Sequence, residues 1–452
     1  MLFFEKSKLK KQIMSILEQI IQLTRKEFKK LPDKRGKKHQ TYLIEDIAMS
    51  AFSVFYFQSG SWLNFQRNMH NQAGRSNAKS LFSINNIPTD NHIRDTLDGI
   101  DTKKLQPIFN KIYHLLLKRK TLDEYQVFDN TISILLDGTY YHHSKKIHCT
   151  HCQTKQKEDT KGKKYTEYYH SAITPTIAHP KSNQVLPLLP EMISNKDGDE
   201  KQDCEINASK RWLSKTNILS ESYKLLILGD DLYCKTSLIK DIRAKDYNYI
   251  FVCKESSHKK MYETIKYIQN LEKVDSKVVT KLNKSRKKET YSYKYLNDVN
   301  LTGDKNSITV NWCSIKVTDE DGNVIYNGAF ATDYKIDNIN VEKIVKIGRS
   351  RWKIENENNN TLKTGGYNLE HNYGHGKEGL SEFILTPNIL SFLIHTICLK
   401  HDDGYKELYE LINNRKTFFN HINTFTTFFY ISDFNTLWQN MIKGYIDGLH
   451  LS

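Results

Sequence analysis

Two acidic residues each follow a run of apolar residues. Asp137 comes directly after TISILL, and Asp230 comes directly after KLLILG. Short apolar runs of this kind predict buried strands, so each carboxylate is expected at a strand end. Two carboxylates on neighbouring strand ends repel each other, and a hard divalent cation would offset that repulsion. The pair therefore predicts a Mg²⁺ site, unless the Asp-Gly pair is only a turn and the Asp-Asp pair only a helix cap.

A third acidic residue lies in RSRWKIENENNNTLKTGG, residues 349–366. Arg351 and Glu355 are four positions apart, so they share one face of a predicted helix, and Trp352 and Ile354 are available for the core. The planar guanidinium of an arginine suits two-point contact with a phosphate better than a lysine does. A salt-bridged surface helix would show the same pattern.

A pair of cysteines could bind a second kind of metal. Cys149-x-x-Cys152 supplies half of a tetrahedral Zn²⁺ site. The alternative is a reduced loop between two strands. The chain has seven cysteines, an odd number, which argues against a disulfide framework and favours a reducing compartment. The other zinc ligands could come from His142, His143, His148, His170 or Cys204.

The composition points to a polyanionic partner. The 452 residues include 67 Lys and Arg against 52 Asp and Glu, a net charge of +15 that is spread along the chain. Such an excess favours nucleic acid, because neutralising phosphates releases counterions, although solubility alone is an alternative. The N-terminus carries charges where a signal peptide needs an apolar core, so we expect no secretion. The most apolar window, residues 383–399, is interrupted and short for a membrane span, and predicts instead a buried helix starting at Thr386-Pro387.

The first 125 residues have helical patterning. A break at Ser59-Gly60-Ser61 separates two helical segments. Further on, Thr89 or Asp90 could cap a short helix that carries Arg94 and stops near Gly99. Helix, turn and helix in a basic chain suggest DNA docking, and an ordinary helical bundle fits the pattern equally well.

From residue 131 onward the pattern mixes strands with helices, which predicts an α+β or α/β sheet domain. A β-rich stretch is expected at 256–340 with a turn at DEDGN (319–323), and helices resume at 341. The run at 281–288 is expected to be a polar loop. Before 256, we expect strands at 131–136, 171–178, 184–189, 224–229 and YIFVCK (249–254), and helices at 204–215 and 236–244.

The motifs LLDGT, ILGDDLY and RWKIE, taken together, resemble those of the DDE transposases of bacterial insertion sequences. The resemblance is to the branch, IS-four-like, in which a β-rich insertion interrupts a ribonuclease H-like catalytic core before the last acid. It spans about residues 45–400. Asp230 lies 93 positions after Asp137 (230 − 137), and Glu355 lies 125 after Asp230 (355 − 230), which leaves room for the insertion.

Two positions depart from the family signature. Gly348 stands where a tyrosine is usual, three residues before Arg351, and Lys363 lies one position later than the usual lysine, where Leu362 stands. At 100° per residue, that lysine would be rotated about 80° from Glu355 unless a helical bulge intervenes. Glu357 is a second choice for the third acid.

The resemblance implies a ribonuclease H-like mixed sheet flanked by helices, interrupted by a β-rich insertion and preceded by a helical N-terminal region. The domain boundaries that we expect are 1–125 for a helical DNA-binding region, 126–255 for the first part of the core, 256–340 for the insertion, 341–400 for the second part of the core, and 401–452 for a helical C-terminal region.

The implied activity is Mg²⁺-dependent strand cleavage and strand transfer at transposon ends. Asp137, Asp230 and Glu355 would be the catalytic residues and would hold two Mg²⁺ ions, for which Mn²⁺ could substitute, about 3.5 to 4 Å apart. The implied partners are the terminal inverted repeats and the target DNA, with a homodimer in the complex, at the nucleoid of a prokaryotic cytoplasm and without a membrane. A catalytically inactive DNA-binding relative and a structure-specific nuclease are the alternatives. The candidate DNA contacts are Arg351, Lys363, Lys210, Arg211 and Arg94.

Overall fold

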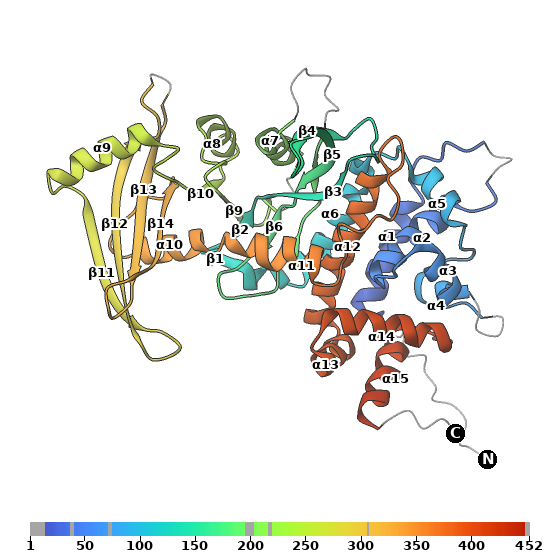
Figure 1. Cartoon of the computed structure of the whole chain (residues 1–452). Coiled ribbons are helices and arrows are strands. Elements are labelled where there is room, and N and C mark those ends of the chain that lie inside the picture. The colour runs from blue at the N-terminus through green and yellow to red at the C-terminus, as the bar shows by residue number, and fades with distance from the viewer. Residues whose placement is uncertain are drawn as a thin grey trace, which may run out of the picture. The chain divides into compact units, whose positions relative to one another are not determined.

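A computed structural model describes residues 14–36, 40–70, 75–194, 203–215, 219–304 and 307–447 (Figure 1). The chain divides into two compact units. Unit 1 comprises Met1–Ile112 and Thr364–Ser452, and unit 2 comprises Tyr113–Lys363. The two units are described separately below.

Unit 1 is helical in its described residues. Helix α12 packs against α2, and every residue of α2 is buried. The break at Ser59-Gly60-Ser61 is confirmed, because it falls between α2 and α3. The helices of this unit are α1 (Ile16–Phe28), α2 (Ile44–Tyr56), α3 (Trp62–His70), α4 (Asn77–Phe82), α5 (Asp90–Leu97), η2 (Thr102–Leu105), α6 (Gln106–Lys118, which continues into unit 2), α12 (Leu380–His401), α13 (Asp403–Ile412), α14 (Arg415–Phe428) and α15 (Phe434–Ile446).

Two helices of unit 1 test the expected boundaries. Helix α5 begins as predicted, because the Thr89 hydroxyl accepts a hydrogen bond from the His92 N–H at 3.4 Å. The predicted start at Thr386 is wrong, since α12 begins at Leu380 and contains Pro387. The buried side chains on both sides of this proline outweigh the roughly 3 kcal/mol that it costs inside a helix. Although α12 is long and apolar enough to cross a membrane, 94% of its most apolar window is buried in the protein.

Unit 2 combines strands and helices, so the expected mixture of α and β structure is confirmed. The predicted helices at 204–215 and 236–244 correspond to α7 and α8. The elements are η3 (Thr121–Tyr125), β1 (Gln126–Phe128), β2 (Thr131–Leu135), β3 (Gly138–Ser144), β4 (Gln153–Glu158), β5 (Lys164–Ile173), β6 (Thr176–Ala178), β7 (Leu186–Pro187), β8 (Glu191–Ile193), α7 (Glu205–Lys215), β9 (Lys224–Gly229), α8 (Thr236–Arg243), β10 (Asn248–Val252), α9 (Lys259–Asn270), β11 (Asp275–Leu282), β12 (Lys288–Asn300), β13 (Thr309–Thr318), β14 (Val324–Thr332), α10 (Val341–Arg349), η4 (Ile354–Asn359) and α11 (Asn360–Thr364).

The larger sheet of unit 2 has the order β11-β12-β13-β14-β10-β9-β2-β6-β7, and β1 also pairs with β2. Its centre is parallel, since β9 pairs in parallel with both β2 and β10. Strands β2 and β9 are almost completely buried, as expected for continuous apolar runs in the middle of a sheet. A smaller sheet has the order β3-β5-β4, and β8 pairs with β5.

The stretch expected to be β-rich does not form a separate sheet. Strand β14 pairs antiparallel with β10, so β11–β14 continue the larger sheet (Figure 1). The stretch also begins with a helix, α9, which was not predicted; its buried Met261 and Ile265 are four residues apart and form the helical face that packs on β12. The loop expected at 281–288 is shorter than predicted, because β11 runs to Leu282 and β12 starts at Lys288. The turn at 319–323 is confirmed, with Gly322 at a φ of +84°.

Candidate active site

The two predicted strand-end acids lie at matching positions of neighbouring parallel strands. Leu135 of β2 is opposite Leu228 of β9, and the Leu136 N–H donates to the Leu228 carbonyl at 2.8 Å. Paired residues of these two strands are 93 positions apart in sequence (228 − 135), and Asp137 and Asp230 are separated by the same number (230 − 137). Neighbouring strands are about 4.8 Å apart. Both carboxylates therefore leave the sheet at the same edge.

A fourth carboxylate, which the sequence analysis missed, lies beside Asp137. Glu205 is the first residue of α7, and a Cβ atom added to Gly138 would come within 2.5 Å of its Cδ. The Tyr233 hydroxyl donates to Glu205 Oε2 at 3.2 Å. Burial raises the pKa of Glu205, and the charge of Asp230 raises it further, against the hydrogen bond from Tyr233. No motif marks this residue; the only signal is that the predicted helix at 204–215 opens with an acid.

Glu355 lies on a π-helical turn, η4, and is held by the arginine of the RWKIE motif. Arg351 Nη2 and Glu355 Oε1 are 2.7 Å apart. The side chain of Glu355 is 50% exposed, whereas that of Arg351 is 18% exposed. The predicted pairing of these two residues on one face is therefore confirmed, and the carboxylate of Glu355 can be reached from solvent.

Several neighbouring charged residues affect the pKa of Asp137. Burial raises the pKa of Asp137 to about 7; Glu205 adds to the rise, Arg351 opposes it, and Glu355 and Asp230 add smaller contributions. Four carboxylates thus act on one another at this edge of the sheet.

The protein also provides a neutral donor to the buried acid. Asn359 Nδ2, at the end of η4, donates to Asp137 Oδ2 at 3.1 Å. The Asn359 side chain also accepts a hydrogen bond from the Thr174 hydroxyl at 2.8 Å. These contacts fix the end of the π-helical turn against Asp137.

The carboxylate oxygens of these acids lie further apart than the ligand atoms of a metal site. Among the residues that the structure describes, groups of three or more ligand atoms within 4.8 Å of one another consist of cysteine and histidine side chains only. Because like charges repel, a wider spacing is expected for carboxylates than for thiols and imidazoles.

The two departures from the family signature have structural explanations. A Cβ atom at Gly348 would come within 2.7 Å of Cδ1 of Phe330 and 3.0 Å of Cγ2 of Ile250, so a tyrosine has no room there. The π-helical turn is the bulge that the position of Lys363 requires, because a π turn contains one residue more than an α turn. With this extra residue, we expect Lys363 to lie nearer the face of Glu355 than a regular α-helix would place it.

A family model for a transposase DDE domain matches residues 205–393. The matched stretch contains Glu205, Asp230, Arg351 and Glu355 and begins after Asp137. The match indicates transposase function, and DNA is the partner that this family implies. No curated protein matches the chain.

Four of the five candidate DNA contacts form ion pairs within the protein, and one of these is the pairing of Arg351 with Glu355 described above. Lys210 pairs with Asp241 at 3.1 Å. Arg94 of unit 1 pairs with Asp90 at 2.6 Å. Arg211 Nη2 lies 2.6 Å from Asp203 Oδ2 and donates to the Met192 carbonyl at 2.9 Å, contacts that fasten α7 to β8. Of these five residues, Arg351 lies close enough to the carboxylates to affect the pKa of Asp137.

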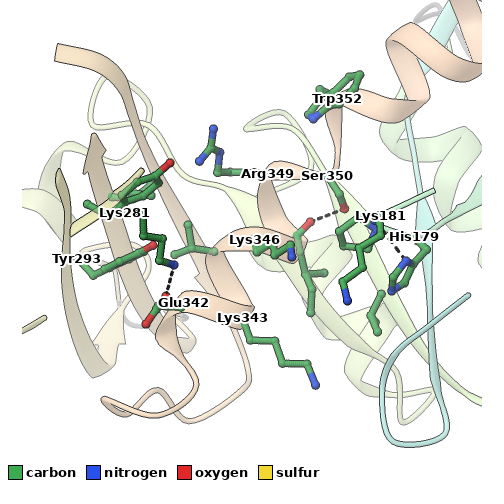
Figure 2. A pocket seen from close by; sticks show the side chains of 16 residues that line it. His179, Lys181, Lys281, Tyr293, Glu342, Lys343, Lys346, Arg349, Ser350 and Trp352 are labelled. Atoms are coloured by element: carbon green, nitrogen blue, oxygen red, sulfur yellow. Dashed lines mark hydrogen bonds and ion pairs between the residues drawn. The ribbon is translucent and has the colours of Figure 1, made fainter. Parts of the chain in front are cut away.

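A basic hollow of about 770 Å³ lies along α10 (Figure 2). Figure 2 shows Lys181, Lys343, Lys346 and Arg349 around it, and Trp352 belongs to its lining. Burial lowers the pKa of the nearby His179, and the positive charges of Lys181, Lys346 and Lys353 lower it further. The hollow therefore has the positive potential that a phosphate backbone requires.

The predicted cysteine pair has a histidine partner, and a second cluster was not predicted. Cys149 and Cys152 meet His170, one of the five expected additional ligands. In the second cluster, hydrogen bonds with Cys253 and then His258 lower the pKa of the Cys234 thiol, against the effect of its burial. This second cluster arises because Cys234 and Cys253 follow the neighbouring strands β9 and β10, a pairing that has no local sequence pattern.

Proposed function

We propose that this protein is a DNA transposase that catalyses Mg²⁺-dependent strand cleavage and strand transfer at transposon ends by a cut-and-paste mechanism. The observation that carries the proposal is the matched position of Asp137 and Asp230 on adjacent parallel strands, with Glu355 close enough to affect the pKa of Asp137. Glu205, which lies beside Asp137, extends the site to four acids.

The donor set suits a hard divalent cation. Asp137, Asp230, Glu355 and Glu205 would offer only carboxylate oxygens, which Mg²⁺ and Mn²⁺ prefer. The raised pKa of Asp137 supports this fit, because a buried acid among other acids lacks the positive charge that a cation would provide. Bound divalent ions would activate the attacking oxygen and stabilise the leaving one.

The residues of the chain have separate roles in this proposal. Asn359 holds the Asp137 carboxylate in position. Glu355 would help to hold the cation, and Arg351, which now pairs with Glu355, would then bind a DNA phosphate at two points. Lys363 would contact the same strand, and the basic hollow along α10 would hold the duplex backbone beyond the cleaved phosphate.

The proposal also covers the fold of the core, the DNA-binding segment and the oligomeric state. The parallel centre β2-β9-β10 with β6 antiparallel beside β2 supports a ribonuclease H-like core. We infer an IS-four-like bacterial element from the LLDGT, ILGDDLY and RWKIE motifs. The helical segment within 1–125 would bind the terminal inverted repeat. A homodimer would join two DNA ends in the prokaryotic cytoplasm.

The test is cleavage and joining of DNA that carries the inverted repeats flanking the gene. We expect Mg²⁺-dependent activity that falls by about 10³-fold or more in Asp137→Asn, Asp230→Asn and Glu355→Gln. Glu357→Gln, two residues from Glu355 on the same turn, is the matched control and should retain activity. Unchanged activity in Asp137→Asn would contradict the proposed site, cleavage without joining would indicate a nuclease, and DNA binding without cleavage would indicate an inactive relative.

A further inference from the structure

We propose that Cys149, Cys152 and His170 form a structural zinc site that fastens the small sheet of unit 2. The site is separate from the carboxylates, and its ligands are soft sulfur and nitrogen atoms rather than oxygen. The proposal does not depend on the DNA chemistry above, because zinc content can be measured without any substrate.

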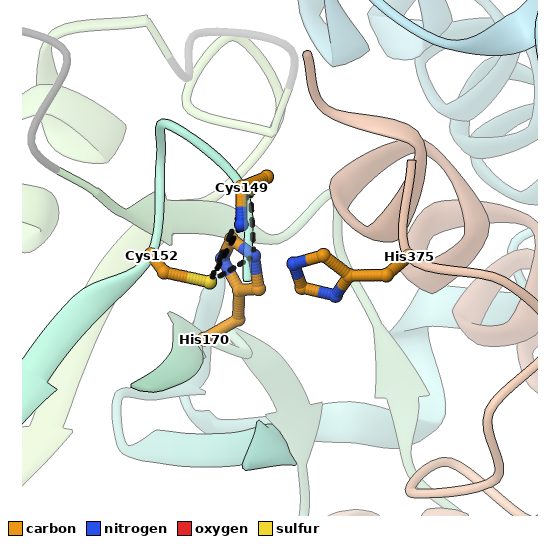
Figure 3. Close-up of side chains that lie close together, drawn as sticks. All are labelled: Cys149, Cys152, His170 and His375. Atoms are coloured by element: carbon orange, nitrogen blue, oxygen red, sulfur yellow. Dashed lines mark hydrogen bonds between the residues drawn. The ribbon is translucent and has the colours of Figure 1, made fainter. Parts of the chain in front are cut away.

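The ligand atoms already lie at coordination distances from one another (Figure 3). The Sγ atoms of Cys149 and Cys152 are 4.0 Å apart, and each lies 3.3 Å from Nε2 of His170. Tetrahedral zinc with ordinary bond lengths places two sulfurs about 3.8 Å apart and each sulfur about 3.5 Å from a nitrogen. The observed triangle matches this pattern, whereas a 4.0 Å sulfur separation is too long for a disulfide.

The backbone prepares the two cysteines for this arrangement. The Cys149 N–H points to Cys152 Sγ at 3.5 Å, and the Cys152 N–H donates to the Cys149 carbonyl at 3.3 Å. The turn therefore brings both sulfurs to one side, and a backbone N–H contact to sulfur would stabilise a thiolate. Cys152 and His170 are buried, and Cys149 is half-buried.

The histidine comes from β5, the strand that pairs with both β3 and β4. His170 lies on β5, where it is paired in register with His142 of β3, and its ring stacks on Tyr141 with the ring centroids 5.6 Å apart. The stacking fixes the ring plane, so Nε2 faces the cysteine turn. A structural zinc binds four ligands, so one ligand comes from outside these three residues.

The proposed zinc would stabilise β3 and β5, the two strands that lie next to Asp137. Strand β3 starts at Gly138, and the Thr174 N–H after β5 donates to the Asp137 carbonyl at 3.0 Å. Zinc would join the loop between β3 and β4 to the middle of β5, and binding would release two thiol protons to solvent. The expected consequence is a stiffer support for the strand end that carries Asp137.

The experiment measures zinc in the purified full-length chain and then the visible spectrum after Co²⁺ replacement. We expect about one zinc per chain at this site and the intense d–d and sulfur-to-cobalt bands of a tetrahedral site with two thiolates. Cys152→Ser and His170→Ala should lose that zinc. His170→Cys should keep it, and its third thiolate should make the sulfur-to-cobalt absorption more intense. The folded state of each variant is checked by circular dichroism.

Two matched controls separate this site from the other cysteines. Cys313→Ser removes a buried cysteine of β13, and Cys234→Ser removes a cysteine of the second cluster; both should leave the cobalt spectrum unchanged. The proposal is overturned if the wild type binds no zinc, if folded Cys152→Ser keeps the full zinc content and spectrum, or if folded His170→Cys loses the metal. Loss of the spectrum in Cys234→Ser alone would place the metal in the other cluster and would also overturn it.

Discussion

The carboxylates around Asp137 and the cluster of Cys149, Cys152 and His170 lie in the same unit, but they differ in how close their ligand atoms are. The cysteine and histidine atoms are at coordination distances. The carboxylates come from β2, β9, α7 and η4 and remain further apart. Thiols and a neutral imidazole can pack together without a metal, whereas ionised carboxylates repel one another. The difference fits the two proposals, in which zinc would stay bound to the cysteine cluster and Mg²⁺ would exchange at the carboxylates.

The largest expected effect tests whether burial, and then the neighbouring acids, destabilise the ionised form of Asp137. The rise of the Asp137 pKa from 3.8 to about 7 means that the folded protein binds this proton more tightly than the unfolded chain. Stability should therefore fall as the pH rises from about 4 to about 7, by at most about 4 kcal/mol. Asp137→Asn removes the titrating group and should make the magnesium-free protein more stable than the wild type above pH 7.

Denaturant unfolding at pH 5 and pH 8 in magnesium-free buffer measures this difference. The advantage of Asp137→Asn should be larger at pH 8, and added Mg²⁺ should reduce it by stabilising the wild type. Asp129→Asn, in the turn before β2, serves as the matched control. An equal effect at both pH values would contradict a raised pKa of Asp137 in the folded protein.

The second effect tests whether Glu205 belongs with the three predicted acids. Glu205→Gln keeps the shape and the hydrogen bond from Tyr233 but removes one negative charge. We expect Mg²⁺-dependent cleavage to slow by about 10- to 100-fold, with a raised Mg²⁺ requirement. Asn207→Ala, at an exposed position of the same helix, should be unchanged. A rate for Glu205→Gln within about twofold of wild type would reduce the acidic site to three members.

The smallest effect concerns the neutral donor to Asp137. Asn359→Ala removes the hydrogen bonds to Asp137 and Thr174 and should cost about 1 kcal/mol of unfolding free energy. Asn360→Ala, its exposed neighbour, should cost less. The zinc content should stay constant in both variants, because the Cys149 cluster shares no residue with this contact. A lower zinc content in Asn359→Ala would show that the two regions are coupled.

Much of the acidic site could be predicted because its signals are local. The apolar runs before Asp137 and Asp230 require buried strands, and parallel pairing then brings both ends to one edge. The four-residue spacing of Arg351 and Glu355 likewise determines their contact. Glu205 could not be found this way, because its nearness to Gly138 depends on how α7 packs.

Three other features could not be predicted from local sequence patterns: the choice of His170, the start of α12 and the presence of α9. CxxC marked the cysteines, but the choice of His170 among five candidates depends on the register of β3 and β5. The start of α12 at Leu380 was missed because local proline chemistry favours a helix start at Thr386, and burial overrides that preference. Helix α9 was missed because strand signals follow it closely along the chain.

The pairing of β14 with β10 has a consequence for any attempt to shorten the protein. Excising residues 256–340 would uncover the N–H and C=O groups that β10 now shares with its neighbour, next to the parallel strands that carry Asp230. An exposed strand of this kind recruits other chains and leads to aggregation. Residues 256–340 therefore also cover this edge of the sheet, and a shorter fragment would need a replacement for them.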